Sequence, residues 1–357
     1  MRSARLAGVL AASIAGPVWA GEWPAEIAAH QTGIGTHFTT AKGVTLYVYD
    51  RDTLGVSTCV DKCIEVWPAL AAPVDAKPAG HWTPIERADG TRQWAYRGRP
   101  LYTFARDPLP GTTLGDGVQD IWHIAVDLAP RPAGVKFEGT IVGRVAADDR
   151  GLTLYVRDKG DCAKECLRTW APVPAPWAAN AVGAWKAVTR SDDGTRQWAY
   201  QGNPVYTYVR DTLPGEIKGA GVDKAWRAVV LQPAPALPPG ITLQPSDFGP
   251  IFADSSGMSL YTVPDLQAQQ DAALCNKDCM TIDWKPFVAA ADAVPIGNWS
   301  AEALPDGRRQ WFYRAMPVFL YAHDRKPGDI HGDRYGVGNG FGGFHVIPQI
   351  TLREEAL

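Results

Sequence analysis

The sequence predicts a mainly β protein made of three tandem copies of one small β-rich unit, each with a short helical turn that carries a Cys-x3-Cys pair. Two observations lead to this prediction. The 357 residues include 29 prolines and 36 glycines, which leave little room for long helices between these breakers. A long pattern of aromatic, cysteine and turn residues also recurs three times, as expected of a repeat architecture.

The first element expected is a signal peptide over residues 1–20. Two arginines precede a mostly apolar stretch that ends in Val18-Trp19-Ala20, with small residues at the positions that a signal peptidase reads. This stretch is too short to span a bilayer, which takes about 20 apolar residues. We therefore expect a periplasmic or secreted protein without a transmembrane segment. We also expect no lipid anchor, because the first cysteine is Cys59.

The charge of the chain argues against nucleic acid as a partner. The formal net charge is −3, and removal of the two arginines in residues 1–20 changes it to −5. No basic run is left in the remaining sequence. Counterion-driven binding to nucleic acid needs clustered lysine and arginine, so we expect none.

The three copies share one order of segments. Each has Gly-x-x-Leu-Tyr, the cysteine pair, a tryptophan, Asp-Gly-x-Arg-Gln-Trp-x-Tyr, Pro-x-aromatic and a Pro-Gly turn. Proline-rich joins favour extended backbone between the copies. We therefore assign the copies to residues 21–130, 131–236 and 237–357.

Within a copy, alternation of aromatic residues predicts strands. In copy one the segments 93–96 and 101–104 alternate on either side of Arg97-Gly98, which predicts a hairpin. A second hairpin is expected between 38–40 and 46–48. The residues between the cysteines do not alternate, so a short helical turn is expected there. Each copy then has five or six short strands.

A Tyr-x-aromatic-x-x-Asp motif recurs along the chain, once with phenylalanine first. Its members are Tyr47, Tyr49 and Asp52; Tyr102, Phe104 and Asp107; Tyr206, Tyr208 and Asp211; and Phe319, Tyr321 and Asp324. Over roughly residues 43–345 the chain thereby resembles a bacterial family of secreted and lipoprotein repeats of unknown function. The resemblance implies an exported β-rich repeat protein and no particular reaction. Arg157 and Val263 replace the expected aromatic residue in the first halves of copies two and three.

The motif allows two interpretations. Phenolate and carboxylate groups can bind hard cations such as ferric iron. Alternatively, the aromatic residues form core, and the aspartate, which precedes Pro-Gly, caps a turn by accepting backbone N–H groups. We favour the structural interpretation because the motif recurs together with the turn residues.

The cysteines also allow two interpretations. They are Cys59 and Cys63, Cys162 and Cys166, and Cys275 and Cys279. An exported chain with an even number of cysteines favours three local disulfides, and residues four apart on a helical turn lie within disulfide range. The alternative is a soft-metal or redox site such as one for Cu(I). Such a site needs a third ligand, and no histidine recurs at a fixed offset from the pairs.

Copy three has the best local candidate for a metal ion. His323, Asp324, Asp329 and His331 lie close enough in sequence to form a small acidic cluster. A glycine-rich stretch follows at 336–343, which could let backbone approach a ligand, although a flexible loop is the favoured interpretation. No other cofactor is expected.

No catalytic motif is found: there is no Gly-x-Ser-x-Gly, no His-Glu-x-x-His and no phosphate loop. We therefore interpret the chain as an exported, non-catalytic binding or accessory protein of the bacterial envelope. Its partner would be an unknown protein, ligand or envelope polymer. The alternative is a periplasmic metal-binding or electron-transfer accessory protein.

Overall fold

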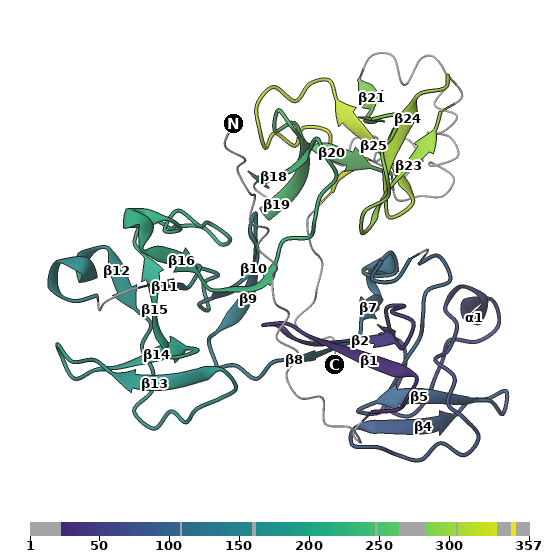
Figure 1. The fold of residues 1–357 in the computed structure, drawn as a ribbon, viewed down its shortest axis with the longest axis horizontal. Helices are drawn as coiled ribbons and strands as arrows, with labels where there is room; N and C mark the ends of the chain where they lie inside the picture. Colours follow the sequence, from purple (N-terminus) through teal and green to yellow (C-terminus); the bar gives the residue numbers. More distant parts are fainter. Residues whose placement is uncertain are drawn as a thin grey trace, which may run out of the picture.

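The computed structural model has three β-rich lobes, one for each copy of the repeat (Figure 1). It describes residues 23–107, 109–158, 162–246, 249–263, 283–304, 306–333 and 344–347. The mainly β class and the three small units are confirmed. We call the lobes units 1, 2 and 3 and label them with the ranges 21–130, 131–236 and 237–357. The expected signal peptide lies outside the described residues.

Unit 1 has eight strands and two short helical turns. They are β1 (Ile27–Gln31), β2 (Gly35–Thr40), β3 (Tyr47–Tyr49), α1 (Lys62–Val66), β4 (Trp82–Glu86), β5 (Arg92–Tyr96), β6 (Arg99–Pro100), η1 (Val118–Asp120), β7 (Trp122–Ile124) and β8 (Val126–Leu128).

Unit 2 repeats this order. Its elements are β9 (Lys136–Thr140), β10 (Gly143–Ala147), β11 (Tyr155–Arg157), η2 (Lys164–Arg168), β12 (Trp170–Pro172), β13 (Trp185–Thr189), β14 (Arg196–Tyr200), β15 (Asn203–Tyr208), η3 (Val222–Lys224), β16 (Trp226–Ala228) and β17 (Val230–Pro233).

Unit 3 follows the same plan in its described residues. Its elements are β18 (Ile241–Ser246), β19 (Gly249–Asp254), β20 (Leu260–Thr262), β21 (Trp284–Pro286), β22 (Val288–Ala289), β23 (Trp299–Ala303), β24 (Arg309–Tyr313), β25 (Met316–Tyr321) and β26 (His345–Val346).

The first predicted hairpin occurs in a short form, whereas the second is reduced to a single bridge. β5 turns into β6 through Arg97 and Gly98, which have φ angles of 47° and 81°. A two-residue hairpin with positive φ at both central positions matches the right-handed twist of its strands. In the other predicted hairpin, Thr39 bridges Thr45, and β3 beyond it pairs with β7.

Each unit is built from two similar halves related by a pseudo-twofold axis. In the first half of unit 1 the β1–β2 hairpin leads to Tyr47, and in the second half the β4–β5 hairpin leads to Tyr102. The Tyr47 N–H donates to the carbonyl of Tyr102 at 2.8 Å, and the Tyr102 N–H donates back to that of Tyr47 at 3.0 Å. The two halves therefore join through the segments that carry the Tyr-x-aromatic-x-x-Asp motif.

Two aromatic rings stack face to face across each pseudo-twofold axis. Their centroids are 3.7 Å apart for Trp67 and Trp122, 3.6 Å for Trp170 and Trp226, and 3.7 Å for Trp284 and Phe344. A glycine lies against each stack. A Cβ atom on Gly115 would lie 2.7 Å from Cη2 of Trp67, so a larger residue would displace the ring.

The three units meet on the side of their first hairpins, β1–β2, β9–β10 and β18–β19, which lie toward the middle of the molecule (Figure 1). Between units 1 and 2, the Gly33 N–H donates to the Leu231 carbonyl at 2.8 Å. Ile34 also packs into the core cluster of unit 2. Between units 1 and 3, the Asn298 side chain bonds to Thr113. Among the described residues, no helix is long and apolar enough to cross a membrane.

Adding one methyl group at Gly219, which lies against the ring stack of unit 2, should lower the stability of the protein. The Cβ of Gly219→Ala would meet Cη2 of Trp170 at 2.8 Å and Cζ of Tyr155 at 2.9 Å. Overpacking of this kind costs about 1–3 kcal/mol, so the guanidinium unfolding midpoint should fall. The matched control is Gly139→Ala, whose Cβ would meet only Pro250, at 3.9 Å. Equal midpoints for the two variants would contradict this packing.

His37 should make stability depend on pH. Burial, aided by the positive charges of Arg144 and His30, lowers the pKa of His37 from 6.5 to about 4. The unfolded chain therefore takes up this proton first, and the stability that the neutral ring contributes is lost as the pH falls from about 6.5 to about 4. The loss in unfolding free energy should be about 2 kcal/mol between pH 7 and pH 4.5. Denaturant unfolding of His37→Gln should show a smaller loss than wild type, and equal losses would contradict the assignment.

Candidate functional site

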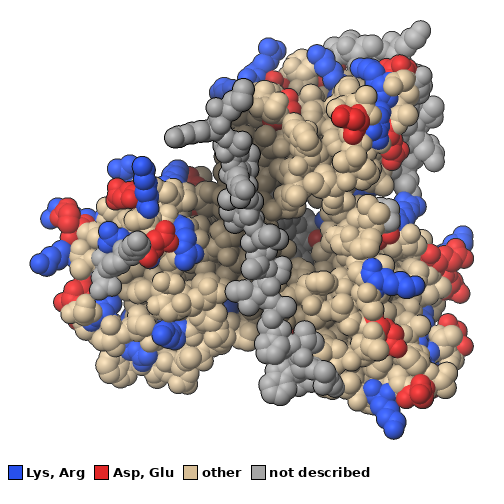
Figure 2. Space-filling model, viewed as in Figure 1, with Lys and Arg blue, Asp and Glu red and all other residues tan. Residues whose placement is uncertain are grey.

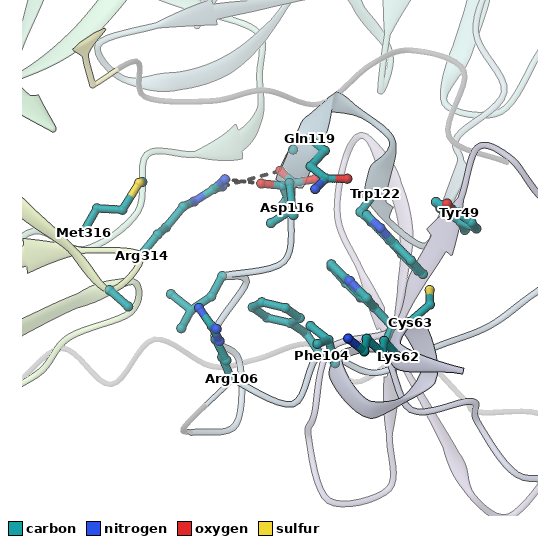
Figure 3. A pocket seen from close by; sticks show the side chains of 16 residues that line it. Tyr49, Lys62, Cys63, Phe104, Arg106, Asp116, Gln119, Trp122, Arg314 and Met316 are labelled. Atoms are coloured by element: carbon teal, nitrogen blue, oxygen red, sulfur yellow. Dashed lines mark hydrogen bonds and ion pairs between the residues drawn. The ribbon is translucent and has the colours of Figure 1, made fainter. Parts of the chain in front are cut away.

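A pocket of about 630 Å³ lies where unit 3 meets unit 1 (Figure 3). Unit 1 supplies most of its wall, from β3, α1, η1 and the loops around them. Unit 3 supplies Arg314, Ala315 and Met316, which form the turn between β24 and β25. Figure 3 shows Arg314 and Met316 reaching in from one side and the aromatic residues of unit 1 on the other.

The wall from unit 1 is a stack of four rings in the order Tyr49, Trp122, Trp67 and Phe104. Tyr49 stacks on Trp122 with centroids 4.2 Å apart, and Phe104 lies 4.4 Å from Trp67 at an angle of 33°. The rings at the two ends, Tyr49 and Phe104, are the second aromatic residues of the two Tyr-x-aromatic-x-x-Asp motifs in unit 1. Each end packs on the tryptophan of the opposite half, so the pseudo-twofold symmetry builds the wall.

The turn of unit 3 is held in place by polar contacts to unit 1. The Arg314 guanidinium donates to the backbone carbonyl of Asp116 and lies 3.6 Å from its Oδ2. The Thr113 N–H donates to Oδ1 of Asn298 at 2.9 Å, and Nδ2 of Asn298 donates to Oγ1 of Thr113 at 2.8 Å. Burial raises the pKa of Asp116, and the charge of Arg314 opposes this shift. The Arg314 guanidinium therefore lies beside a buried carboxyl group and favours its ionised form, although burial outweighs this effect.

Two cations in the lining remain available to a ligand. Lys62 and Arg106 line the pocket, and neither forms an ion pair or a side-chain hydrogen bond with any described residue. Lys62 begins α1, and Arg106 follows Phe104 in the second motif. The pocket therefore combines an aromatic wall with two positive charges that are not paired within the described part of the chain.

The first tyrosine of each unit bonds the aspartate of the second motif segment in the same unit. The Tyr47 hydroxyl donates to Asp107 at 2.8 Å, Tyr155 donates to Asp211 at 2.5 Å, and Tyr261 donates to Asp324 at 2.7 Å. The other carboxylate oxygen accepts a backbone N–H, from Leu114, Lys218 and His331 respectively. These aspartates hold the turn that follows them, in the manner of the structural interpretation.

The electrostatics of these pairs favour neutral phenols. Burial, reinforced by the neighbouring carboxylate, raises the pKa of Tyr47, Tyr155 and Tyr261 far above the ordinary tyrosine value. Burial also raises the pKa of Asp107, Asp211 and Asp324. Neutral phenols act as hydrogen-bond donors here, whereas a ferric site would need phenolate oxygens.

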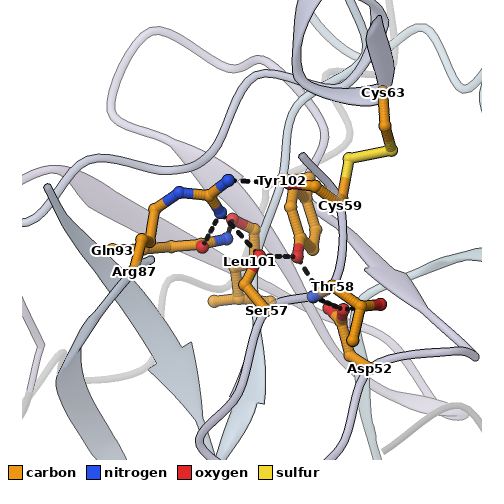
Figure 4. The surroundings of a disulfide bond; sticks show 9 residues. All are labelled: Asp52, Ser57, Thr58, Cys59, Cys63, Arg87, Gln93, Leu101 and Tyr102. Atoms are coloured by element: carbon orange, nitrogen blue, oxygen red, sulfur yellow. Dashed lines mark hydrogen bonds between the residues drawn. A yellow bond between two sulfur atoms is a disulfide. The ribbon is translucent and has the colours of Figure 1, made fainter. Parts of the chain in front are cut away.

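Unit 1 also has the reciprocal bond between its halves: the Tyr102 hydroxyl donates to Asp52 at 2.7 Å. This bond ends a buried chain in which Arg87 donates to Ser57 at 2.6 Å, and Ser57 lies 2.7 Å from the Tyr102 hydroxyl (Figure 4). Arg87 also donates to Gln93 and to the carbonyl of Cys59. The network therefore links a buried arginine, the motif and the disulfide loop.

Units 2 and 3 keep less of this network. In unit 2, Arg190 contacts Gln197 and the Cys162 carbonyl, as Arg87 does in unit 1. In unit 3, Leu304 takes the place of that arginine, and Phe319 takes the place of Tyr102.

Two of the three predicted disulfides lie in the described residues. Cys59 is bonded to Cys63 and Cys162 to Cys166, each with Cα atoms 5.3 Å apart. Cys59 is buried, whereas Cys63 lines the pocket. Cys275 and Cys279 lie outside the described residues.

Of the four metal candidates of unit 3, His331 lies near Asp324 and Asp329, whereas His323 pairs with a different aspartate. His323 Nε2 lies 2.8 Å from Asp283, whereas His331 Nδ1 lies 3.3 Å from Asp324 and 3.7 Å from Asp329. Oδ2 of Asp329 already accepts two backbone N–H groups. In the described part of the chain no three such residues are grouped as a metal site. The glycine-rich stretch at 336–343 lies outside that part.

The remaining motif residues take their places in the cores. Tyr206 and Tyr208 are buried around the Trp170 stack, and Phe319 and Tyr321 pack around Trp284. Sequence reasoning missed the pocket cations, the contact of Arg314 with Asp116 and the Arg87 network. The glutamine that recurs between an arginine and a tryptophan, at Gln93, Gln197 and Gln310, is buried in all three units and is a signal that could have indicated buried polar chemistry.

A protein-family model described as a secreted repeat of unknown function matches the chain at residues 29–71, 83–126 and 186–230. The predicted family resemblance is confirmed. The first two matches coincide with the two halves of unit 1, and the third with the second half of unit 2. The secreted repeat is thus half a unit, and two of them form one pseudo-twofold core. No curated protein and no solved structure matches the chain.

The bond between the Tyr102 hydroxyl and Asp52 should contribute measurably to the stability of unit 1. Tyr102→Phe leaves Asp52 and Ser57 each without one partner, which should lower the free energy of unfolding by about 1–3 kcal/mol. In the matched variant Tyr206→Phe, the lost hydroxyl has no carboxylate partner in the described residues, so the loss should be smaller. Guanidinium unfolding measures both losses, and a larger loss for Tyr206→Phe would contradict the role given to Asp52.

Proposed function

We propose that this exported repeat protein is a non-catalytic binding protein, and that the pocket between units 1 and 3 is its ligand site. One observation carries the proposal: two units together enclose an aromatic wall beside Lys62 and Arg106, two cations that no described residue pairs. A volume of about 630 Å³ is within the range of small-molecule sites, about 300–1,000 Å³. The secreted family and the disulfides of units 1 and 2 indicate that the protein works outside the cytoplasm.

The chemistry of the lining supports binding rather than catalysis. Asp116 is engaged by Arg314 and by the N–H of Ile124. Cys63 is held in a disulfide and has no thiolate to offer. The carboxyl group and the cysteine of the lining are therefore not free to act as a general acid, a general base or a nucleophile. An accessory role, in which the protein holds or delivers a ligand in the envelope, fits such a site.

A bulky side chain at the pocket should block it. Val66, 37% exposed, lines the pocket at the end of α1, so the indole of Val66→Trp would fill the space without disturbing a buried core. Two planar fluorescent probes, N-phenyl-1-naphthylamine and 1-anilinonaphthalene-8-sulfonate, report binding by their increase in emission. Wild type should bind at least one of them, and Val66→Trp should lose that binding.

The control is Val60→Trp, which adds the same ring at a position that is 45% exposed and lies outside the lining. It should bind the probe as wild type does. The proposed site is excluded by a wild-type protein that binds neither probe, or by a Val66→Trp variant that retains wild-type affinity.

A further inference from the structure

We infer that the pocket selects anions with a planar apolar body, such as aromatic carboxylates, sulfonates or phosphate esters. This inference rests on the proposed function, because it assigns a ligand class to the same pocket. It goes further in predicting which charge the ligand has and which side chains distinguish it from neutral molecules of the same shape.

The first argument is the charge of the lining. Lys62, Arg106 and Arg314 are cations, and Asp116 is the single acidic residue among the lining residues. Asp116 is paired with Arg314, so Lys62 and Arg106 are the lining cations that no described acidic side chain pairs. On the face drawn in Figure 2, acidic and basic side chains are mixed over all three lobes, so a broad basic surface does not account for this charge.

The second argument is the orientation of the rings. The faces of Trp67 and Trp122 cover one another, and their outer faces are covered by Phe104 and Tyr49. A ligand in the pocket therefore meets the edges of the two indoles. Ring edges carry the positive part of the aromatic quadrupole, so they favour an electron-rich ring face or an anionic group. The wall and the cations therefore select for the same kind of ligand.

The third argument is that the repeat does not need a lysine at the position of Lys62. Directly before the second cysteine, unit 1 has Lys62, whereas the sequence has Glu165 in unit 2 and Asp278 in unit 3. Glu165 pairs with Arg168 on the surface. Asp223 of η3 likewise replaces Gln119 of η1. Arg106 has a counterpart in Arg210 of unit 2, so Lys62 is the lining cation that is specific to the unit against which the turn of unit 3 docks.

The two probes form a matched pair, because both are N-phenylnaphthylamines and one has a sulfonate. Wild-type protein should bind 1-anilinonaphthalene-8-sulfonate more tightly than N-phenyl-1-naphthylamine in a fluorescence titration. The variants Lys62→Gln and Arg106→Gln should each weaken sulfonate binding roughly threefold, and together roughly tenfold, since the charges are partly exposed. Their affinity for the neutral probe should stay unchanged.

Lys77→Gln is the control, because Lys77 is an exposed lysine of unit 1 outside the pocket. It should bind both probes as wild type does. Added salt should weaken binding of the sulfonate more than binding of the neutral probe, because screening acts on exposed charges.

The outcomes separate the inference from the proposed function. If neither probe binds, the proposed function itself fails. If both probes bind with equal affinity, or the Lys62 and Arg106 variants bind the sulfonate as tightly as wild type, the anion selectivity is overturned while the binding function stands. Loss of binding of both probes in these variants would show a structural role and would also overturn the inference.

Discussion

The face-to-face contact between two aromatic rings across the pseudo-twofold axis is the interaction on which each unit depends. Trp67 comes from one half of unit 1 and Trp122 from the other, so the stack forms only when the halves are joined. Gly115 leaves space for it, and the bond from Tyr47 to Asp107 holds the adjoining turn. Aromatic burial of this size dominates the energetics of small domains.

The same constraint explains how the units differ. The stack is kept in all three, whereas the polar network behind it is complete in unit 1 and missing its key members in unit 3, where Leu304 and Phe319 replace an arginine and a tyrosine. A buried polar network with only some of its hydrogen bonds made costs stability. It is therefore expected that unit 3 lacks both the arginine and the tyrosine hydroxyl, and not only one of them. Unit 1 has a second use for its stack, because the turn of unit 3 docks against its edge and encloses a pocket.

The sequence predicted what short-range patterns determine. Alternation located the hairpin around Arg97-Gly98, and cysteine spacing predicted the bond between Cys59 and Cys63. It did not predict that Tyr47 bonds the aspartate of the other motif, because the partners are 60 residues apart and meet only through the pseudo-twofold symmetry. The pocket was missed for a similar reason: Arg314 reaches Asp116 only because units 1 and 3 pack together, and side-chain periodicity does not encode that packing.

The central claim is that the ring stack of unit 1 is at once the core of its unit and the wall of a binding site. A crystal structure of the full protein with 1-anilinonaphthalene-8-sulfonate tests this most directly. The account predicts the naphthalene ring against Phe104 and the edge of Trp122, with the sulfonate within hydrogen-bonding distance of Lys62 or Arg106. An empty pocket, with the molecule bound instead at an exposed ring such as Trp177, would contradict it.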